Sequence, residues 1–450
     1  MKSLELFKPE IKQLIQDQQW NDLKDLLAEF PAPDISDLLE DTDEAKRILI
    51  LRLLPRGELL SEVFAHMETK LQSDILQALS VEETRLILSE LSPDDRTDFL
   101  ENLPGQAIQK LLTLLSPVDR RESLQLLGYP KETVGRLMTP DYVAVRPEWT
   151  IEQAVAHIRA TGIKSETIDV IYVTDRSGKL LDALELRRII LAEPQQLIEE
   201  IMDYSVVSVP ALDDREKAVQ LIRHYDLLAL PVVDASGVLL GIVTVDDLFD
   251  VAEEETTEDF QISAAVEPLK MSYRESSAFS LYSKRIFWLV ALLGISIVTT
   301  GIIASQEASL TSAIALVFFI PLLIGAGGNT GSQSATLMIR ALATGDIREG
   351  QLIAAFFREI GIGILLGVTM GLASWFLGFF KGGIQIASII SLAMITIVVI
   401  SSIIGFALPL LLLRLGMDPA MASNPLISSV MDILGLLIYF SIASLVLNSV

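Results

Sequence analysis

The last third of the chain consists of apolar segments that are long enough to cross a lipid bilayer as helices. About 20 consecutive apolar residues are needed to span the hydrocarbon core of a bilayer. Five segments meet this condition, at residues 286–304, 310–339, 360–380, 384–413 and 425–447, with Pro321 and a glycine cluster interrupting the second. In a bilayer every backbone polar group must be satisfied within the protein, which a helix achieves by itself. The sequence therefore predicts a five-helix transmembrane domain over residues 285–450.

Charge separates this domain from the rest of the chain. The whole chain holds 35 basic and 59 acidic residues, a formal net charge of −24. Seven basic and six acidic residues lie from Lys284 onward, so residues 1–283 carry the other 28 basic and 53 acidic residues. Such an acidic surface attracts cations and repels nucleic acid and anionic lipid, so no nucleic-acid partner is expected. A merely solubilising role for this surface stays open at this point.

The basic residues of the membrane region predict its orientation. The N-terminus, MKSLELFKPEIKQ, lacks the apolar core of a signal peptide, so the acidic region should stay in the cytosol. With five crossings, the C-terminus then lies outside. Six basic residues fall on the predicted cytosolic segments and only Lys381 falls outside, in agreement with the positive-inside rule. We therefore expect a multi-pass protein of the plasma membrane, in contact with the lipid bilayer.

The chain contains no cysteine and three histidines. Disulfides and thiolate metal sites are therefore not expected. A metal handled by this protein should be held by oxygen atoms, which favours Mg²⁺, Ca²⁺ or Mn²⁺.

Residues 1–130 show short amphipathic runs separated by Leu-Ser or Leu-Pro pairs. These pairs recur every 12 residues, at Leu79-Ser80, Leu91-Ser92, Leu103-Pro104 and Leu115-Ser116. Ser and Pro commonly open helices, so the spacing predicts short helices stacked in a superhelix. Asp94 and Asp95 fall in a predicted first helical turn, where acids stabilise the helix dipole. That structural role alone could explain both acids.

Residues 131–260 contain an internal repeat. YVTDRSGKLL at 172–181 is echoed by PVVDASGVLL at 231–240, and each copy has the pattern of a strand, a turn, a strand and a helix. The copies, 131–200 and 201–260, resemble tandem cystathionine-β-synthase (CBS) domains of mixed α/β structure. Such domains often bind adenosine nucleotides such as ATP, with an acid before the last helix on the ribose. Asp247 has this position in the second copy, whereas the first copy has Arg188 there and Asp182 in place of a glycine.

Eight acids and no basic residue lie between Val245 and Phe260. A solvated helix face or a frayed linker would explain this run. Alternatively, like charges at helical spacing repel each other by roughly a few tenths of a kcal/mol per pair, and a bound divalent cation would relieve the repulsion. Residues 261–284 then predict a connecting helix, from Pro268 to Ser283, that leads into the first crossing and transmits movement to it.

Asp432 is the one readily ionised side chain in the last crossing, PLISSVMDILGLLIYFSIASLVL. A carboxylate in mid-membrane costs about 2.5–3.5 kcal/mol on insertion scales, so it normally faces a partner, an ion or water. Asp432 therefore indicates a cation path. A protonated Asp432 in a helix–helix hydrogen bond is the alternative.

The second crossing carries the motif GAGGNTGSQSATL at residues 325–337. Its glycines permit local unwinding or a close approach of two backbones. The polar side chains among them are costly in a membrane unless they meet each other, water or an ion. A phosphate-binding loop is not indicated, because no Lys-Ser/Thr pair follows the glycines and no soluble strand precedes them.

Together, GGNTGSQSATL, RALATGD, GMDPAMASNPL and SVMDILGLLIY resemble the MgtE family of magnesium transporters, and the resemblance covers the whole chain. It implies a homodimeric, Mg²⁺-selective channel or channel-like transporter for magnesium uptake, with the second and fifth crossings lining a pore on the two-fold axis. Asp432 matches the acid that holds hydrated Mg²⁺, and Gly328 and the backbone near Gly435 match positions that flank the ion. Ser332 stands where some members carry Asn. The other motif residues assigned to the ion pathway are Asn329, Asn424 and Asp418.

The same resemblance implies that the cytosolic part is a Mg²⁺ sensor. Acids of the helical stack, the second CBS domain and the linking helix would bind Mg²⁺ when it is plentiful and shut the pore. The matching acids here are Glu62, Asp94, Asp98, Glu216, Asp226, Asp247, Asp250, Glu255, Glu258 and Asp259.

Two other functions stay open on the sequence alone. The first is a proton- or Na⁺-coupled transporter of another solute, with nucleotide-sensing CBS domains and Asp432 as the proton carrier. The second is a membrane-anchored scaffold that recruits a partner through the helical stack. An enzyme is not expected, because no nucleophile is paired with a base.

Overall fold

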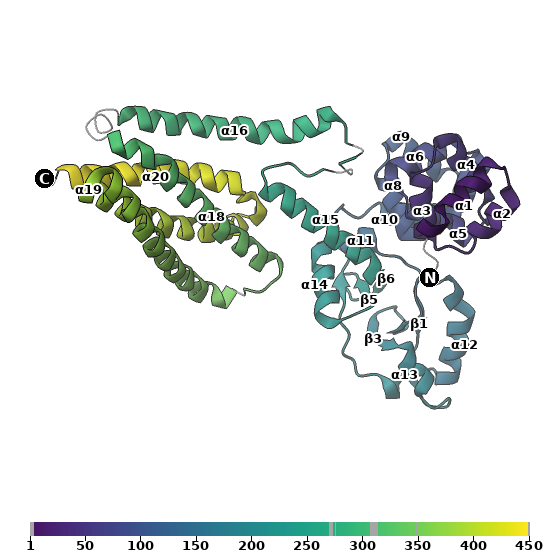
Figure 1. Cartoon of the computed structure of the whole chain (residues 1–450). Helices are drawn as coiled ribbons and strands as arrows, with labels where there is room; N and C mark the ends of the chain where they lie inside the picture. Colours follow the sequence, from purple (N-terminus) through teal and green to yellow (C-terminus); the bar gives the residue numbers. More distant parts are fainter. Residues whose placement is uncertain (1–3, 270–272, 275, 307–313, 348, 449–450) are drawn as a thin grey trace. The chain divides into compact units, whose positions relative to one another are not determined.

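The structure is a computed structural model that describes residues 4–269, 273–274, 276–306, 314–347 and 349–448 (Figure 1). The chain divides into two compact units, Met1–Ala252 and Glu253–Val450. The first unit contains the helical stack and both repeats, and the second contains the long apolar helices.

The N-terminal part of the first unit is the predicted stack of short helices. They are α1 (Leu4–Gln16), α2 (Trp20–Leu27), α3 (Ala32–Glu40), α4 (Glu44–Leu53), α5 (Glu58–Ala65), α6 (Thr69–Ala78), α7 (Val81–Glu90), α8 (Pro93–Glu101), α9 (Gly105–Leu112) and α10 (Pro117–Leu126). The serine of each Leu-Ser pair caps a helix by accepting a backbone hydrogen bond, at Ser80, Ser92 and Ser116. Caps of this kind satisfy otherwise unpaired N–H groups, so the 12-residue spacing sets the helix starts.

The two repeats form two three-stranded sheets of the same topology. The first sheet contains β1 (Ala144–Val145), β2 (Val170–Thr174) and β3 (Leu180–Glu185), and the second contains β4 (Val209–Pro210), β5 (Ala229–Val233) and β6 (Leu239–Thr244). In each sheet the first pair of strands is parallel and the second is antiparallel. The accompanying helices are α11 (Val134–Leu137), α12 (Ile151–Thr161), η1 (Gly162–Lys164), α13 (Leu186–Leu191), η2 (Ile198–Ile201) and α14 (Arg215–Tyr225). The predicted α/β repeat is confirmed.

The segment after the second repeat corrects the predicted bounds of the connecting helix. Helix α15 (Val245–Ser263) ends in a Schellman motif, in which Ala265 has φ 57° and the Val266 N–H donates to the Gln261 carbonyl at 2.9 Å. The described residues from 264 to 277 are irregular, and residues 270–272 and 275 lie outside the described part. Of the described residues in the helix predicted from Pro268 to Ser283, those from Ala278 onward are helical, as the start of the next helix, α16.

Side-chain contacts explain this irregular connection. The Leu269 N–H donates to the Gln261 side chain at 2.7 Å, so it is bound to α15 and not to a new helical turn. Glu267 is bound to α16, because its N–H donates to the Lys284 carbonyl at 3.0 Å and its carboxylate pairs with the Lys284 ammonium at 3.2 Å. The Ser277 hydroxyl accepts the Ser280 N–H and starts α16.

In the residues that the structure describes, the second unit contains four helices that are long and apolar enough to cross a membrane. Its elements are α16 (Ala278–Ser305), η3 (Ile314–Phe319), α18 (Ile320–Ala343), η4 (Glu349–Gln351), α19 (Leu352–Arg414), η5 (Pro419–Met421) and α20 (Asn424–Asn448). Within α19, Gly383 has φ 72° and ψ −168°, which divides the helix into two crossings at the predicted connection. The described residues therefore contain five crossings; the predicted start of the second, near Leu310, lies outside them.

The glycine cluster of α18 serves close packing, and the unwinding that its sequence permits does not occur. Helix α18 is continuous from Ile320 to Ala343, and Pro321 lies in its first turn. Helices α18, α19 and α20 pack against one another (Figure 1). A Cβ on Gly405 of α19 would lie 2.2 Å from the Gly331 carbonyl oxygen, so only glycine allows this approach. The Ser401 hydroxyl donates to the Gly327 carbonyl across the same contact.

Candidate functional site

Polar residues recur at every fourth position on α20. Asn424, Ser428 and Asp432 are each four residues apart, so they lie along one face of the helix, with a rise of about 6 Å per step. Ser428 and Asp432 are half-buried and Asn424 is exposed. The spacing therefore continues the polar character of Asp432 toward the N-terminal end of α20.

Helix α18 presents a matching set of groups to this face. The Ser332 hydroxyl donates to the Asn424 carbonyl at 3.3 Å, and the Thr336 hydroxyl donates to the Asn424 side-chain oxygen at 3.3 Å. One turn away, a Cβ on Gly328 would lie 3.1 Å from the Ser428 hydroxyl oxygen. We call these six residues, Gly328, Ser332, Thr336, Asn424, Ser428 and Asp432, the polar face.

The Asp432 carboxylate forms no hydrogen bond or ion pair with another residue that the structure describes. The helix–helix hydrogen bond considered as an alternative is therefore not seen within the described part of this chain. Gly435, one turn further along α20, has its nearest neighbour in Ile397 of α19, since a Cβ added to Gly435 would lie 3.8 Å from the Ile397 Cδ1 atom. Gly328 thus belongs to the polar face, whereas Gly435 packs against an apolar helix.

Asn329 lies beside the polar face and is exposed in the single chain. Gln333 and Thr336 are exposed as well, so three polar side chains follow one side of α18 over about two turns. Polar groups at membrane depth are tolerated where they meet water, an ion or protein. This side of α18 is therefore suited to a water-filled path or to a second copy of the chain.

A second set of candidate residues gathers where the helical stack meets the repeats. Asp94 and Asp95 lie in the first turn of α8, and Asp246 and Asp247 in the first turn of α15. Burial, and then the neighbouring Asp247 carboxylate, raises the pKa of Asp94. The Asp94 Oδ1 atom is buried and has no hydrogen-bond partner in the described part of the chain. These acids, with Glu166 of the first repeat, form what we call the acidic cluster.

Glu166 was not predicted as a site residue. It follows α12 and η1 in the first repeat, and its N–H donates to the Asp141 carbonyl at 2.8 Å. Burial, and then the charges of Asp94, Asp95 and Asp246, raises its pKa to about 7. Three separate parts of the first unit thus contribute negative charge to one place.

The other predicted sensor acids of the first unit are spread over several helices. The side chains of these predicted acids are exposed: Glu62 of α5, Asp98 of α8, Glu216 and Asp226 at the two ends of α14, and Asp250 of α15. Among the residues that the structure describes, no three acidic or histidine side chains lie close enough to hold one metal ion. The individual Mg²⁺ ligands of the sensor therefore stay predictions.

A third acidic group lies in the second unit. Burial, followed by the charges of Asp418, Glu255 and Glu258, raises the pKa of Asp259 to about 6. The Asp418 carboxylate accepts the Ala420 N–H at 2.7 Å and caps η5 just before α20. Arg340, in the last turn of α18, supplies the opposing positive charge.

Comparisons with known proteins decide the family. Family models match residues 30–132 as the MgtE intracellular N domain, 134–194 and 198–254 as CBS domains, and 320–442 as a divalent cation transporter. The magnesium transporter MgtE of Thermus thermophilus is 39% identical over 443 residues, which cover 98% of each chain. The chain belongs to the MgtE family of magnesium transporters. The Bacillus subtilis member is 32% identical over 97% of this chain and 96% of its own.

Two solved structures, one of a Mg²⁺ channel and one of a magnesium transporter, each match more than half of the chain. The cytosolic domain of the Mg²⁺ channel MgtE in complex with ATP is 38% identical, covers 54% of this chain and 98% of that domain, and has a TM-score of 0.51. The soluble part of a magnesium transporter is 30% identical, covers 56% of this chain and 99% of its own, and has a TM-score of 0.53. The helical stack and CBS domains are therefore the cytosolic part of a membrane transporter, and the family is one of transporters and not of enzymes.

Sequence reasoning found the acid of the polar face but missed two of its other members. Serine and threonine are common in membrane helices, where their hydroxyls often bond the backbone of their own helix. Ser428 and Thr336 therefore did not stand out in the sequence. The signal that could have found Ser428 is its position midway between Asn424 and Asp432. Thr336 could be recognised as a member only from the packing of α18 on α20, which no local sequence pattern reveals.

Proposed function

We propose that this chain conducts Mg²⁺ into the cytosol along the polar face, with Asp432 as the acid that holds the ion. The observation that carries the proposal is the register of α18 and α20. This register brings the three polar-face residues of α18 beside the three of α20. The last of these, Asp432, has a carboxylate with no partner among the described residues. The ion pathway would also use the exposed amide of Asn329.

The chemistry of the polar face suits a hydrated Mg²⁺ ion. Mg²⁺ requires near-octahedral oxygen coordination and releases its waters reluctantly. Hydroxyls, amides and one carboxylate can hold such an ion through its water shell. Conduction also needs binding that is weak enough to release the ion, and a single acid per chain meets that need.

We propose that the pore is completed by a second copy of the chain. The exposed polar side of α18 would then face its symmetry mate and not lipid, since a two-fold axis pairs each surface with itself. Two Asp432 carboxylates would flank the axis. Five crossings and the distribution of basic residues support an N-terminus in the cytosol and a C-terminus outside.

Uptake by cells tests the role of Asp432. In cells starved of Mg²⁺, Asp432→Ala should abolish the Mg²⁺ uptake that the parent chain supports. Asp346→Ala is the matched control, because Asp346 is an exposed acid in the turn after α18 and should leave uptake unchanged. Normal uptake by Asp432→Ala, at equal amounts in the membrane, would refute the proposal. A flux that depends on pH and not on the Mg²⁺ concentration would favour the proton-coupled transporter instead.

We propose further that cytosolic Mg²⁺ shuts the pore through the acids of the first unit and of α15. Without a cation, the acids of the acidic cluster repel each other across the contact of α8 with the repeats. Bound Mg²⁺ would relieve this repulsion and bring the helical stack and the second CBS domain together. Moving the open–closed equilibrium from 1:99 to 99:1 requires about 5.5 kcal/mol of differential binding free energy. Several weak sites can share this free energy, and their number makes the response to Mg²⁺ concentration steep.

Protease protection tests the sensor. Mg²⁺ should slow proteolysis of the parent chain in detergent, and Asp247→Asn with Asp250→Asn should lose most of this protection. Glu193→Gln, an exposed acid outside the cluster, is the control and should keep it. Equal protection of the double variant and the parent would exclude these two acids from the sensor.

Asp247 keeps a second proposed role, as the ribose-binding acid of the second CBS domain. Its carboxylate accepts a hydrogen bond from the Thr244 hydroxyl at 2.7 Å, which fixes it at the end of β6. Binding of ATP here would compete with the acidic cluster for the same carboxylate. Asp247→Asn should then weaken ATP binding and Mg²⁺ protection together.

A further inference from the structure

Helix α8 approaches the second CBS domain at both of its ends. Its first turn carries Asp94 and Asp95 beside the acids that open α15, and its last residue, Glu101, lies against α11. Asp94 and Glu101 are seven residues apart, so they lie on the same face of the helix, separated by two turns and roughly 10 Å. One face of α8 therefore meets the repeats at two separate points.

The electrostatic interactions at these two points have opposite signs. At the first point, carboxylates of α8 lie near carboxylates of α15, so the contact is repulsive without a cation. At the second point, the Glu101 Oε2 atom lies 3.4 Å from the Arg136 Nε atom, and the Glu101 Oε1 atom lies 3.7 Å from the Lys131 ammonium. The second point is therefore attractive without any bound ion.

Arg136 is fixed to the second CBS domain, although it precedes the first domain in the sequence. It lies on α11, where the Val134 N–H donates to the Asp213 carbonyl at 2.9 Å. The next N–H group, that of Gly135, donates to the Ala211 carbonyl at 2.8 Å. The ion pair between α8 and α11 therefore joins the helical stack to the second CBS domain.

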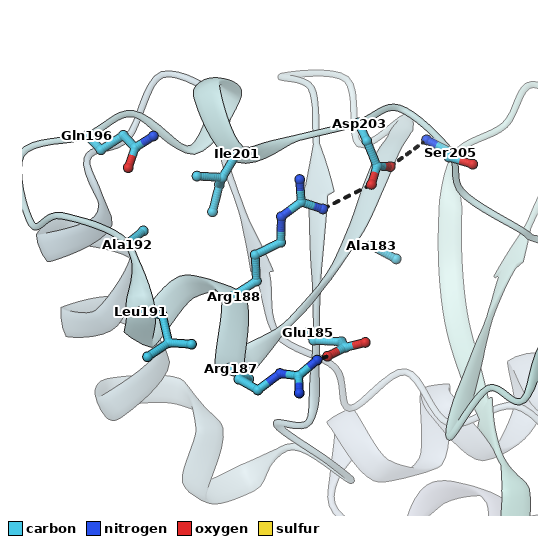
Figure 2. A pocket seen from close by; sticks show the side chains of 10 residues that line it. All are labelled: Ala183, Glu185, Arg187, Arg188, Leu191, Ala192, Gln196, Ile201, Asp203 and Ser205. Atoms are coloured by element: carbon cyan, nitrogen blue, oxygen red, sulfur yellow. Dashed lines mark hydrogen bonds and ion pairs between the residues drawn. The ribbon is translucent and has the colours of Figure 1, made fainter.

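This ion pair is buried, and its members depend on each other. The side chains of Glu101 and Arg136 are 19% and 12% exposed, and the Glu101 Oε2 atom and the Arg136 Nε and Nη1 atoms have no hydrogen-bond partner among the described residues. By comparison, Arg188 and Asp203 of the first CBS domain form a 2.9 Å ion pair with side chains that are 44% and 55% exposed (Figure 2). Water screens an exposed pair, whereas a buried charge without its partner is strongly unfavourable.

We propose that Glu101 and Arg136 are positioning residues for the closure of the cytosolic part, an inference that rests on the closure by Mg²⁺ proposed above. A buried carboxylate is tolerated beside its counter-charge, so the pair selects one docking position of the helical stack on the second CBS domain. This position sets Asp94 near Asp247, where a bound cation then relieves the repulsion. When the stack and the domain separate, both charges of the pair return to water, and the open state does not use them.

Protease protection of the full-length chain in detergent, titrated with Mg²⁺ and without nucleotide, tests the proposal. Glu101→Gln leaves the Arg136 charge buried and unpaired, so the Mg²⁺ concentration at half protection should rise by about threefold or more. Arg136→Met should raise it less, because Lys131 still accompanies the Glu101 carboxylate. The double variant leaves no buried charge at this point, so its half protection should lie within about twofold of the parent's.

A control variant and a Mg²⁺-free measurement separate positioning from general stability. Arg52→Met is the matched control, because it breaks an ion pair inside the helical stack, with Glu83 at 2.8 Å, and should leave half protection unchanged. In Mg²⁺-free buffer, the variants of Glu101 and Arg136 should have the melting temperature of the parent, since the open state does not use the pair.

Three results would overturn the proposal. They are single variants that are protected like the parent, shifts that add in the double variant, and a lower melting temperature of the single variants in Mg²⁺-free buffer. In each case the Mg²⁺ protection of the parent would remain, so the proposed sensor would stand. Absence of Mg²⁺ protection in the parent itself would refute the sensor and this inference together.

Discussion

At the scale of single residues, the membrane unit depends on a contact between two glycines. A Cβ on Gly405 would meet both the Gly331 carbonyl, at 2.2 Å, and the Ser334 Cβ, at 2.9 Å. Both neighbours belong to α18, whose backbone is fixed by its own hydrogen bonds. The close approach lets α19 pack directly against α18.

We predict that Gly405→Ala destabilises the chain by about 1–3 kcal/mol, because the added methyl group overpacks this contact. Gly301→Ala is the matched control, since a Cβ at Gly301 of α16 meets no heavy atom within 4 Å. Thermal unfolding in detergent, followed by circular dichroism, measures the difference. Equal melting temperatures for the two variants would contradict the packing described for Gly405.

The acidic cluster predicts a dependence of stability on pH. Burial and neighbouring charges raise the pKa of Asp94 and Asp247, and that of Glu166 to about 7. Between about pH 4 and pH 7, the folded state therefore binds protons that the unfolded chain has lost. Stability falls as pH rises through this window, because the folded state binds more protons than the unfolded state.

In metal-free buffer, the melting temperature of the first unit should fall between about pH 5 and pH 7. Asp94→Asn with Asp247→Asn should flatten this dependence, and Glu193→Gln should leave it as in the parent. Differential scanning calorimetry of the full chain provides the measurement. A melting temperature that rises over the same range would show that these carboxylates are not held in the protonated form.

The sequence predicted part of this residue-scale account. Asp432 was evident because a lone acid in an apolar run has no local explanation, and Asp94 and Asp247 came from the resemblance to the family. Glu166 left no signal, since it lies in an irregular segment and the charges that raise its pKa come from α8 and α15. The partner of Gly331 was equally hidden, because Gly405 is in a different crossing.

At the scale of elements, α19 depends on one backbone conformation. Gly383 has φ 72° and ψ −168°, which a residue with a Cβ adopts only with strain. The reversal of direction there separates the third crossing from the fourth. The predicted bounds of the third and fourth crossings, 360–380 and 384–413, left Gly383 between them, and its dihedral angles came from the structure.

We predict that Gly383→Ala destabilises the chain by about 1–3 kcal/mol through backbone strain. Gly361→Ala tests the same substitution inside the first half of α19, where a Cβ meets nothing within 4 Å. It should be neutral or stabilising by up to about 1 kcal/mol, because alanine favours helix. Chemical unfolding in mixed micelles compares the two, and similar losses in both would show that Gly383 is not specifically required.

The connection from α15 to α16 shows the limit of pattern reasoning at this scale. The run from Pro268 to Ser283 has no feature that forbids a helix, and a helix was predicted. The structure instead places Ala265 in the left-handed region and binds Leu269 to the Gln261 side chain. Both interactions depend on the end of α15, so local propensity could not reveal them.

At the scale of the whole molecule, the chain joins two units with different chemistry. The cytosolic unit contains the acidic cluster, and the membrane unit contains the polar face. Composition separated an acidic part from an apolar part at Lys284, whereas the structure divides the chain at Glu253, so the acidic end of α15 belongs to the second unit. We propose that Mg²⁺ on the acids of the first unit and of α15 couples the two units, and ion flux at controlled cytosolic Mg²⁺ tests this coupling.

Current recording from the reconstituted chain, with Mg²⁺ varied separately on each side, addresses the central claim most directly. The parent should carry a Mg²⁺ current from the outer side that stops as Mg²⁺ rises on the cytosolic side. Asp432→Asn should carry no Mg²⁺ current at any concentration on either side. A Mg²⁺ current through Asp432→Asn equal to that of the parent would contradict a pathway along the polar face.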